Sequence, residues 1–134
     1  MLHFGMPNKA SSRAFKTAWF GKAAKKARIG DQALGAAIVE VIQGQADDLG
    51  GGVFKKRLND NMHRSIVLAK GGHHWVFAYL YAKKDRANID PDELAAFKKL
   101  AQAYGRMTEA KVASALDQGD LQELFYDEQS QIQE

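Results

Sequence analysis

The 134-residue sequence contains no cysteine, only two prolines and no long hydrophobic run. The absence of cysteine excludes a disulfide scaffold, a zinc site built on thiolates and a cysteine nucleophile. The longest apolar runs, such as residues 75–80, are too short to span a bilayer. Residues 1–5 have neither the basic start nor the apolar stretch of a signal peptide. We therefore expect a cytoplasmic protein with no membrane segment.

The net charge of +3 conceals two parts of opposite sign. Residues 1–90 contain 15 lysines and arginines against 7 acidic residues, whereas residues 91–134 contain 4 against 9. A basic body favours a polyanionic partner, and ordinary solvated charge is the alternative. The length fits one domain, which we place at 13–124, between a loose leader at 1–12 and a polar, frayed tail at 125–134.

Apolar residues recur at helical spacing in the first part of the chain. One interpretation is a helix over 15–27. The other is a short strand over 13–17, followed by a helix that Thr17 caps. Asp31 is a good N-cap for a second helix, and Gly44 is a plausible stop for it. Both interpretations predict an amphipathic helix pair that packs on a core.

The middle of the chain predicts three strands, because β-branched, aliphatic and aromatic residues gather between turn residues. The tight turns at 59–61 and 70–72 imply an antiparallel meander. The glycines just before it are not followed by the Gly-Lys-Ser/Thr of a phosphate-binding loop, so 47–52 is interpreted as a flexible helix-to-strand turn. The predicted strands are Val53–Leu58, His63–Lys70 and 73–83.

Two helices are expected after the meander. Asp90 is placed to be an N-cap, with proline at the first helical position and Glu93 where a capping box needs it, and the helix runs to Gly105. A shorter helix extends from its cap Thr108 to a glycine at 119. Residues 121–126 then dock back onto the core.

Strand alternation assigns the side chains of the meander to faces. Lys55 and Arg57 share one face of the first strand, and in the third strand residues 75, 77, 79, 81 and 83 are expected on a single face. A sheet that carries cations and tyrosines suits single-stranded RNA, because cations neutralise phosphates and aromatic rings stack on unpaired bases. The alternative is that the aromatics are core and the cations are solvated. The cations at strand ends and adjoining turns are Lys55, Lys56, Arg57, Arg64, Lys83, Lys84 and Arg86.

Several kinds of catalytic site find no support in the sequence. His73 and His74 are adjacent, so in a strand they point to opposite faces and do not chelate one ion, and we expect no metal and no cofactor. No serine lies in a nucleophile elbow, and the strands have no paired carboxylates. Cleavage of RNA by its own 2′-hydroxyl stays feasible, because it needs only cations on the phosphate and groups that transfer protons.

Three blocks of the sequence resemble the RelE/HigB toxins of bacterial type II toxin–antitoxin modules, over residues 13 to 124. They are FKTAWF at 15–20, LGGGVFKKR at 49–57 and AKKDRANI at 82–89. The resemblance implies an α+β, RelE/ParE-like fold, with an N-terminal helix pair packed on a twisted antiparallel sheet and with C-terminal helices. It also implies a toxin that stops growth by cutting mRNA on the translating ribosome. The implied partner is a cognate antitoxin of helix-turn-helix type, and operator DNA is bound only through that complex.

The resemblance and the basic sheet together suggest the site residues. Many relatives carry a Gly-Lys-Ser-Gly-Gly-Tyr-Arg stretch where this chain has only residues 59–63, and Arg64 takes the place of that arginine. Arg57 and Arg64 would bind the scissile phosphate, and Tyr81 or His63 would transfer a proton or stack on a base. The expected catalytic residues are Arg57, Arg64, Tyr81 and Lys83, and the expected RNA-binding residues are Lys55, Lys56, His63, Lys84 and Arg86.

Two other functions stay open at this point. Toxins of the ParE type share the fold but poison DNA gyrase and leave RNA intact. A chain that lost its activity with the shortened loop would survive as a non-catalytic partner in an autorepressing toxin–antitoxin complex.

Overall fold

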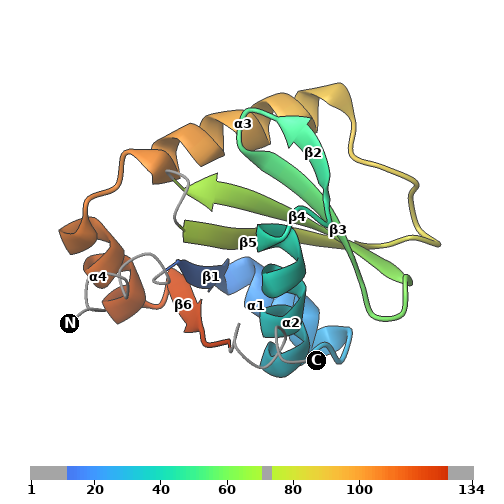
Figure 1. Cartoon of the computed structure of the whole chain (residues 1–134), viewed down its shortest axis with the longest axis horizontal. Coiled ribbons are helices and arrows are strands. Elements are labelled where there is room, and N and C mark those ends of the chain that lie inside the picture. The colour runs from blue at the N-terminus through green and yellow to red at the C-terminus, as the bar shows by residue number, and fades with distance from the viewer. Residues whose placement is uncertain (1–11, 71–73, 127–134) are drawn as a thin grey trace.

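The computed structural model of the chain describes residues 12–70 and 74–126. One mixed sheet of six strands, in the order β2-β3-β4-β5-β1-β6, separates two helical layers. Helices α1 and α2 lie on one side of this sheet, and α3 and α4 lie on the other (Figure 1). The elements are β1 (Arg13–Thr17), α1 (Ala18–Lys26), α2 (Asp31–Ile42), β2 (Asp47–Gly50), β3 (Val53–Leu58), β4 (His63–Lys70), β5 (His74–Ala82), α3 (Pro91–Gly105), α4 (Glu109–Gln118) and β6 (Leu121–Leu124).

The N-terminal segment follows the second of the two interpretations, a strand and then a helix. Thr17 ends β1 and caps α1, its hydroxyl oxygen accepting from the Phe20 amide at 3.0 Å. The prediction that Asp31 is the N-cap of α2 is wrong. Gly30 occupies that position without a side-chain bond, and Asp31 is the first helical residue, paired with Lys16 at 2.6 Å. Its carboxylate still favours the helix N-terminus, because the helix dipole is positive there.

The antiparallel meander β3-β4-β5 is confirmed, and the structure adds three strands to it. Residues 47–52 are not merely a turn, because Asp47–Gly50 pairs with β3 as strand β2. Strand β1 lies parallel to β5, and β6 lies antiparallel to β1 at the sheet edge. The sheet is therefore mixed rather than purely antiparallel, within the α+β, RelE-like fold class that was expected. The expected turn at 70–72 lies partly outside the described residues.

A β-bulge at Ala78 changes which residues of β5 share a face. Ile66 pairs with Tyr79 but Val67 pairs with Phe77, so Ala78 is an extra residue in β5. An inserted residue reverses the alternation beyond it. The prediction that residues 75, 77, 79 and 81 share one face is therefore wrong. Trp75 and Phe77 face the α1–α2 layer, whereas Tyr79 and Tyr81 lie in line with Ile66 and Arg64 on the α3 side.

The C-terminal helices have the caps that the sequence predicts. Asp90 accepts from the Glu93 amide and Glu93 accepts from the Asp90 amide, each at 2.8 Å, which completes a capping box. Thr108 caps α4, and the left-handed Gly119 ends it at φ +84°. None of the helices within 12–70 and 74–126 combines the length and the apolar composition needed for a membrane crossing.

Each side of the sheet has its own hydrophobic core. Phe20, Leu34 and Ile38 of the first helix pair pack on Val67 and Phe77. The second core lies under α3 and α4 and is built on Phe15, Val53, Ile66, Leu68 and Val76. Because α3 covers only the Val53 end of β3, the Arg57 end on the same face is left open, and Arg57 is exposed.

Candidate functional site

Arg57, Arg64 and Tyr81 form one row across the sheet. In the strand register Arg57 lies opposite Arg64, and Arg64 lies opposite Tyr81. Neighbouring strands are about 4.8 Å apart, so the row spans about 10 Å. All three side chains leave the sheet on the α3 side, beyond the part that the second core covers. The structure therefore brings together three of the four residues expected to be catalytic.

The Tyr81 side chain is the most enclosed member of this row. It is 6% exposed, and within the described residues its hydroxyl is buried without a hydrogen-bond partner. The guanidinium of Arg86 lies 5.5 Å from the centre of its ring. Burial raises the pKa of the Tyr81 phenol above its usual value, although Arg64 and Arg86 act in the opposite direction. The phenol is thus protonated at neutral pH and is a potential proton donor.

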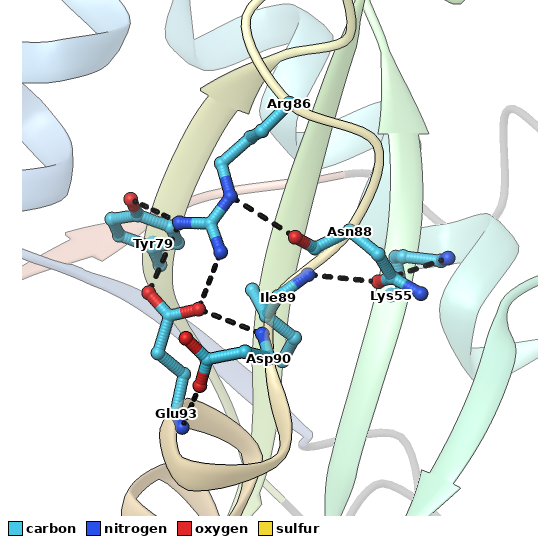
Figure 2. A network of polar contacts seen from close by, with 7 residues as sticks. All are labelled: Lys55, Tyr79, Arg86, Asn88, Ile89, Asp90 and Glu93. Carbon is cyan, nitrogen blue, oxygen red and sulfur yellow. Dashed lines mark hydrogen bonds and ion pairs between the residues drawn. The ribbon is translucent and has the colours of Figure 1, made fainter.

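Arg86 is held by a network of polar contacts at the start of α3 (Figure 2). Both of its terminal nitrogens donate to the carboxylate of Glu93, one at 3.0 Å, and Nε donates to the Asn88 carbonyl oxygen at 3.0 Å. Nη1 also lies 3.4 Å from the Tyr79 hydroxyl. The Glu93 bond raises the pKa of Arg86, and the Arg86 bond, with the Asp90 amide, lowers the pKa of Glu93. Arg86 is therefore fixed above Tyr81 rather than free in solvent.

Lys55 lies one row closer to α3, opposite Ile66 and therefore on the same face as Arg57. Its Nζ donates to Asn88 Oδ1 at 3.4 Å, and that oxygen also accepts from the Ile89 amide (Figure 2). Asn88 therefore ties the 83–90 segment to β3.

The β3–β4 turn is built from three successive residues in the left-handed region. Asn59, Asp60 and Asn61 all have left-handed backbones, with φ of 56°, 53° and 69°. Asparagine and aspartate adopt this conformation more readily than other non-glycine residues. Arg64 Nη1 donates to the carbonyl oxygens of Asn61 and His63, at 3.0 and 3.2 Å. The arginine therefore lies against the turn that precedes it.

Lys83 and Lys84 follow β5 directly and are exposed. They line a depression of about 470 Å³ beside the β3–β4 turn. The Lys83 amide donates to the Met62 carbonyl oxygen at 2.9 Å, which holds this segment to the turn. The other lining residues are Asp60, Asn61, Met62, His63 and Ala82.

Lys56 and His63 lie on the opposite face from the Arg57 row. Lys56 forms an ion pair with Glu40 of α2 at 2.6 Å, and its Nζ also donates to the Gln45 carbonyl oxygen. His63 lies opposite the core residue Leu58, and its Nδ1 is 3.2 Å from Asn59 Nδ2. The structure therefore does not bring these two expected RNA-binding residues to the row.

Sequence reasoning missed two residues at the site, Trp19 and Tyr79. Trp19 stacks on Tyr79 with ring centres 5.1 Å apart, and Tyr79 is 5.9 Å from Tyr81. The sequence signal that points to Trp19 is the expected strand at 13–17. The pairing of that strand with β5 decides where α1 begins, and Trp19 is near the start of α1. Glu93 was expected as a capping residue, but not as the partner of Arg86.

The prediction that His73 and His74 point to opposite faces concerns a position, His73, that lies outside the described residues. Within 12–70 and 74–126, no group of three or more histidine and acidic side chains is arranged to hold a metal ion.

Comparison with known proteins agrees with the fold and the motifs. No curated protein and no solved structure matches the chain. The family model described as the RelE toxin of the RelE/RelB toxin–antitoxin system matches residues 12–124. That match includes every described strand and helix, and with it the row of Arg57, Arg64 and Tyr81. The chain therefore belongs to the RelE toxin family, the toxins of type II toxin–antitoxin systems that pair with a RelB antitoxin.

Proposed function

We propose that this toxin inhibits translation as a ribosome-dependent endoribonuclease that cleaves mRNA. RelE toxins are generally enzymes of this kind. The observation that carries the proposal is the row of two arginines beside a buried tyrosine hydroxyl that has no hydrogen-bond partner among residues 12–70 and 74–126. A buried polar group without a partner is costly, and such groups gather at functional sites.

The proposed reaction uses the RNA's own 2′-hydroxyl as the nucleophile. Its proton passes to a water molecule as its oxygen bonds to the adjacent phosphorus, and the bond from phosphorus to the 5′-oxygen breaks. One product ends in a 2′,3′-cyclic phosphate and the other begins with a 5′-hydroxyl. Negative charge grows on the non-bridging oxygens, and Arg57 and Arg64 stabilise it because guanidinium groups donate in pairs to phosphate.

Tyr81 is proposed to donate the proton that the leaving 5′-oxygen needs. Its raised pKa keeps the phenol neutral, so the group has a proton to give. Lys55, Lys83 and Lys84 would contact neighbouring phosphates, and Arg86 would hold the Tyr81 ring in place. Lys56 and His63 would not contact the scissile phosphate, because they lie on the face of the sheet opposite the Arg57 row.

The proposed partners follow the same assignment. The cognate RelB-type antitoxin would carry a helix-turn-helix domain, and the toxin would reach operator DNA only through that complex. The basic face of the toxin would meet mRNA and the ribosome.

The test combines translation in vitro with growth assays. Purified toxin is expected to cut mRNA during translation, and Arg57→Ala/Arg64→Ala is expected to reduce cleavage at least about 100-fold, because removing such a donor typically has this effect. Arg106→Ala is the matched control, since Arg106 is an exposed arginine at the end of α3.

Three outcomes would contradict the proposal. Full toxicity of the double variant at equal expression would reject the site. Growth arrest with DNA-damage signalling and intact mRNA would identify a gyrase poison. Harmless expression of the wild-type chain without antitoxin would leave only a partner role in a repressor complex.

A further inference from the structure

An exposed tryptophan is connected through Tyr79 to the row of Arg57, Arg64 and Tyr81. Trp19 is 52% exposed, although tryptophan is usually well buried. One of its ring faces stacks on Tyr79 at an interplanar angle of 23°. Tyr79 in turn contacts Tyr81 and Phe97 with centre distances of 5.9 and 5.8 Å. The tryptophan ring is therefore supported from behind and open to solvent in front.

The parallel pairing of β1 and β5 puts Trp19 in this position. Within β5, strand β1 pairs with residues 74–77, in a register that places Lys16 opposite Phe77. Because the two strands run in the same direction, the chain beyond Lys16 advances alongside the following residues of β5. It turns into α1 at Thr17, and two residues later Trp19 lies beside Tyr79. The rings of Tyr81, Tyr79 and Trp19 thus form a continuous aromatic stripe that ends at the start of α1.

The surroundings of Trp19 carry positive charge. The ring lines a depression of about 670 Å³ together with Lys22, Ala23, Lys25 and Lys26. The three lysines are exposed, and within residues 12–70 and 74–126 none of them forms an ion pair. A supported aromatic ring among free cations has the two elements that bind single-stranded nucleic acid, a stacking platform and phosphate neutralisation.

We propose that Trp19 is a base-stacking site for the RNA, outside the row that contacts the scissile phosphate. This inference rests on the proposed function, because the RNA that stacks on Trp19 is the same strand that passes Tyr81. A base of the substrate stacks on the open face of Trp19, and the flanking phosphates lie against Lys22 and Lys26. The site positions the RNA and takes no part in proton transfer.

The charge favours RNA over a protein partner as the occupant. A protein-docking patch is usually depleted in lysine at its centre, whereas this one surrounds its single aromatic ring with lysines. The ring also stacks on Tyr79, so part of the cost of ordering it is met before a base binds.

Tryptophan fluorescence tests the proposal directly. The chain has two tryptophans, so Trp75→Phe leaves Trp19 as the only reporter. Its titration uses a short single-stranded RNA with every 2′-hydroxyl methylated, which cannot be cleaved. Saturable quenching that weakens with added salt is expected. A fluorescein-labelled copy of the same RNA gives the Kd of each variant by anisotropy.

Trp19→Ala is expected to raise that Kd about 5- to 150-fold, the range for loss of one stacked base. Trp19→Phe should raise the Kd less than Trp19→Ala does, because a smaller aromatic ring still stacks on the base. Phe125→Ala is the matched control, since Phe125 is an aromatic residue that is 81% exposed and outside this surface. Circular dichroism of each variant checks that it is folded.

Three results would overturn the proposal. These are an unchanged Kd for Trp19→Ala, RNA binding without quenching of Trp19, and a wild-type protein that does not bind the RNA. If Trp19→Ala weakens only the antitoxin complex, the surface docks protein instead. Wild-type protein that shows Trp19-dependent binding but cuts no mRNA would reject the proposed nuclease function and leave this inference standing.

Discussion

The Tyr81 hydroxyl is buried and has no partner among the described residues, which makes it a liability for stability. An unsatisfied buried polar group costs about 1–3 kcal/mol. In the proposed mechanism, this position therefore loses stability and gains a proton donor beside two arginines. Its neighbour Arg86 has the opposite character, because every contact of that guanidinium fixes it in place.

Tyr81→Phe separates these two effects. The substitution removes the buried hydroxyl and keeps the ring, so the free energy of unfolding should stay level or rise by about 1 kcal/mol. Cleavage should fall about 100- to 10,000-fold, the usual effect of losing a positioned proton donor. Urea unfolding and translation-coupled cleavage measure the two quantities, with Tyr104→Phe on α3 as the control. A clear loss of stability would show that the hydroxyl has a partner in solution.

Glu93 holds both a neighbouring side chain and the start of α3, because its carboxylate binds Arg86 and closes the capping box. The pKa of Glu93 is lowered by the Arg86 bond and by the Asp90 amide. A carboxyl group whose pKa is lower in the folded state than in the unfolded state stabilises the fold when the pH lies above its unfolded pKa, here 4.5. That stabilisation is lost as the pH falls through the lower, folded pKa.

Glu93→Gln should therefore lower the Tm at pH 7, and the gap to wild type should narrow as the pH falls below 4.5. Thermal melts across this pH range measure the effect. Asp92→Asn serves as the control, since Asp92 is an exposed carboxylate in the same first turn. A gap that stays constant with pH would mean that the ion pair contributes nothing to stability.

At the scale of elements, Gly52 sets how closely β3 approaches α3. Its φ is +84°, and a Cβ there would lie 3.3 Å from the Ala101 Cβ atom of α3. Gly44 has a similar φ of +88°, but a Cβ there would meet nothing within 4 Å. A comparison of alanine substitutions at Gly52 and Gly44 therefore separates the cost of backbone strain from the cost of contact with α3.

Gly44→Ala should lower the free energy of unfolding by about 1–2 kcal/mol, the cost of a left-handed backbone for a residue with a Cβ. Gly52→Ala should lower it further, because its Cβ also presses on Ala101. Chemical denaturation of both variants measures the difference. Equal losses would show that α3 can shift away from the sheet at no cost.

At the scale of the whole molecule, β6 brings the end of the described chain to its beginning. Ala14 pairs with Leu124, and Thr17 pairs with Leu121. The two leucines belong to opposite cores, Leu124 to that of α1 and α2 and Leu121 to that of α3 and α4. This short edge strand therefore joins both layers of the fold.

Leu124→Ala should lower the free energy of unfolding by about 2–5 kcal/mol, because it leaves a cavity at a site that is 2% exposed. Gln122→Ala in the same strand is the exposed control and should change it by less than about 0.5 kcal/mol. Denaturant unfolding measures both. A small effect of Leu124→Ala would mean that β6 is not part of the cooperative unit.

The sequence by itself determined the local features of this protein. The capping box at Asp90, the Thr108 cap and the strands of the meander all follow from short patterns, because caps, turns and alternation depend on neighbouring residues. The blocks at 49–57 and 82–89 also identified the RelE family, which the family model confirms.

Only the tertiary structure decided which side chains meet. The bulge at Ala78 turned Tyr79 and Tyr81 toward the arginines, and the parallel register of β1 placed Trp19 against Tyr79. Register and bulges arise from pairing between distant strands, so periodicity within one strand does not reveal them. Alternation already placed Lys56 and Arg57 on opposite faces, but only the tertiary structure showed that Lys56 forms an ion pair with Glu40 of α2.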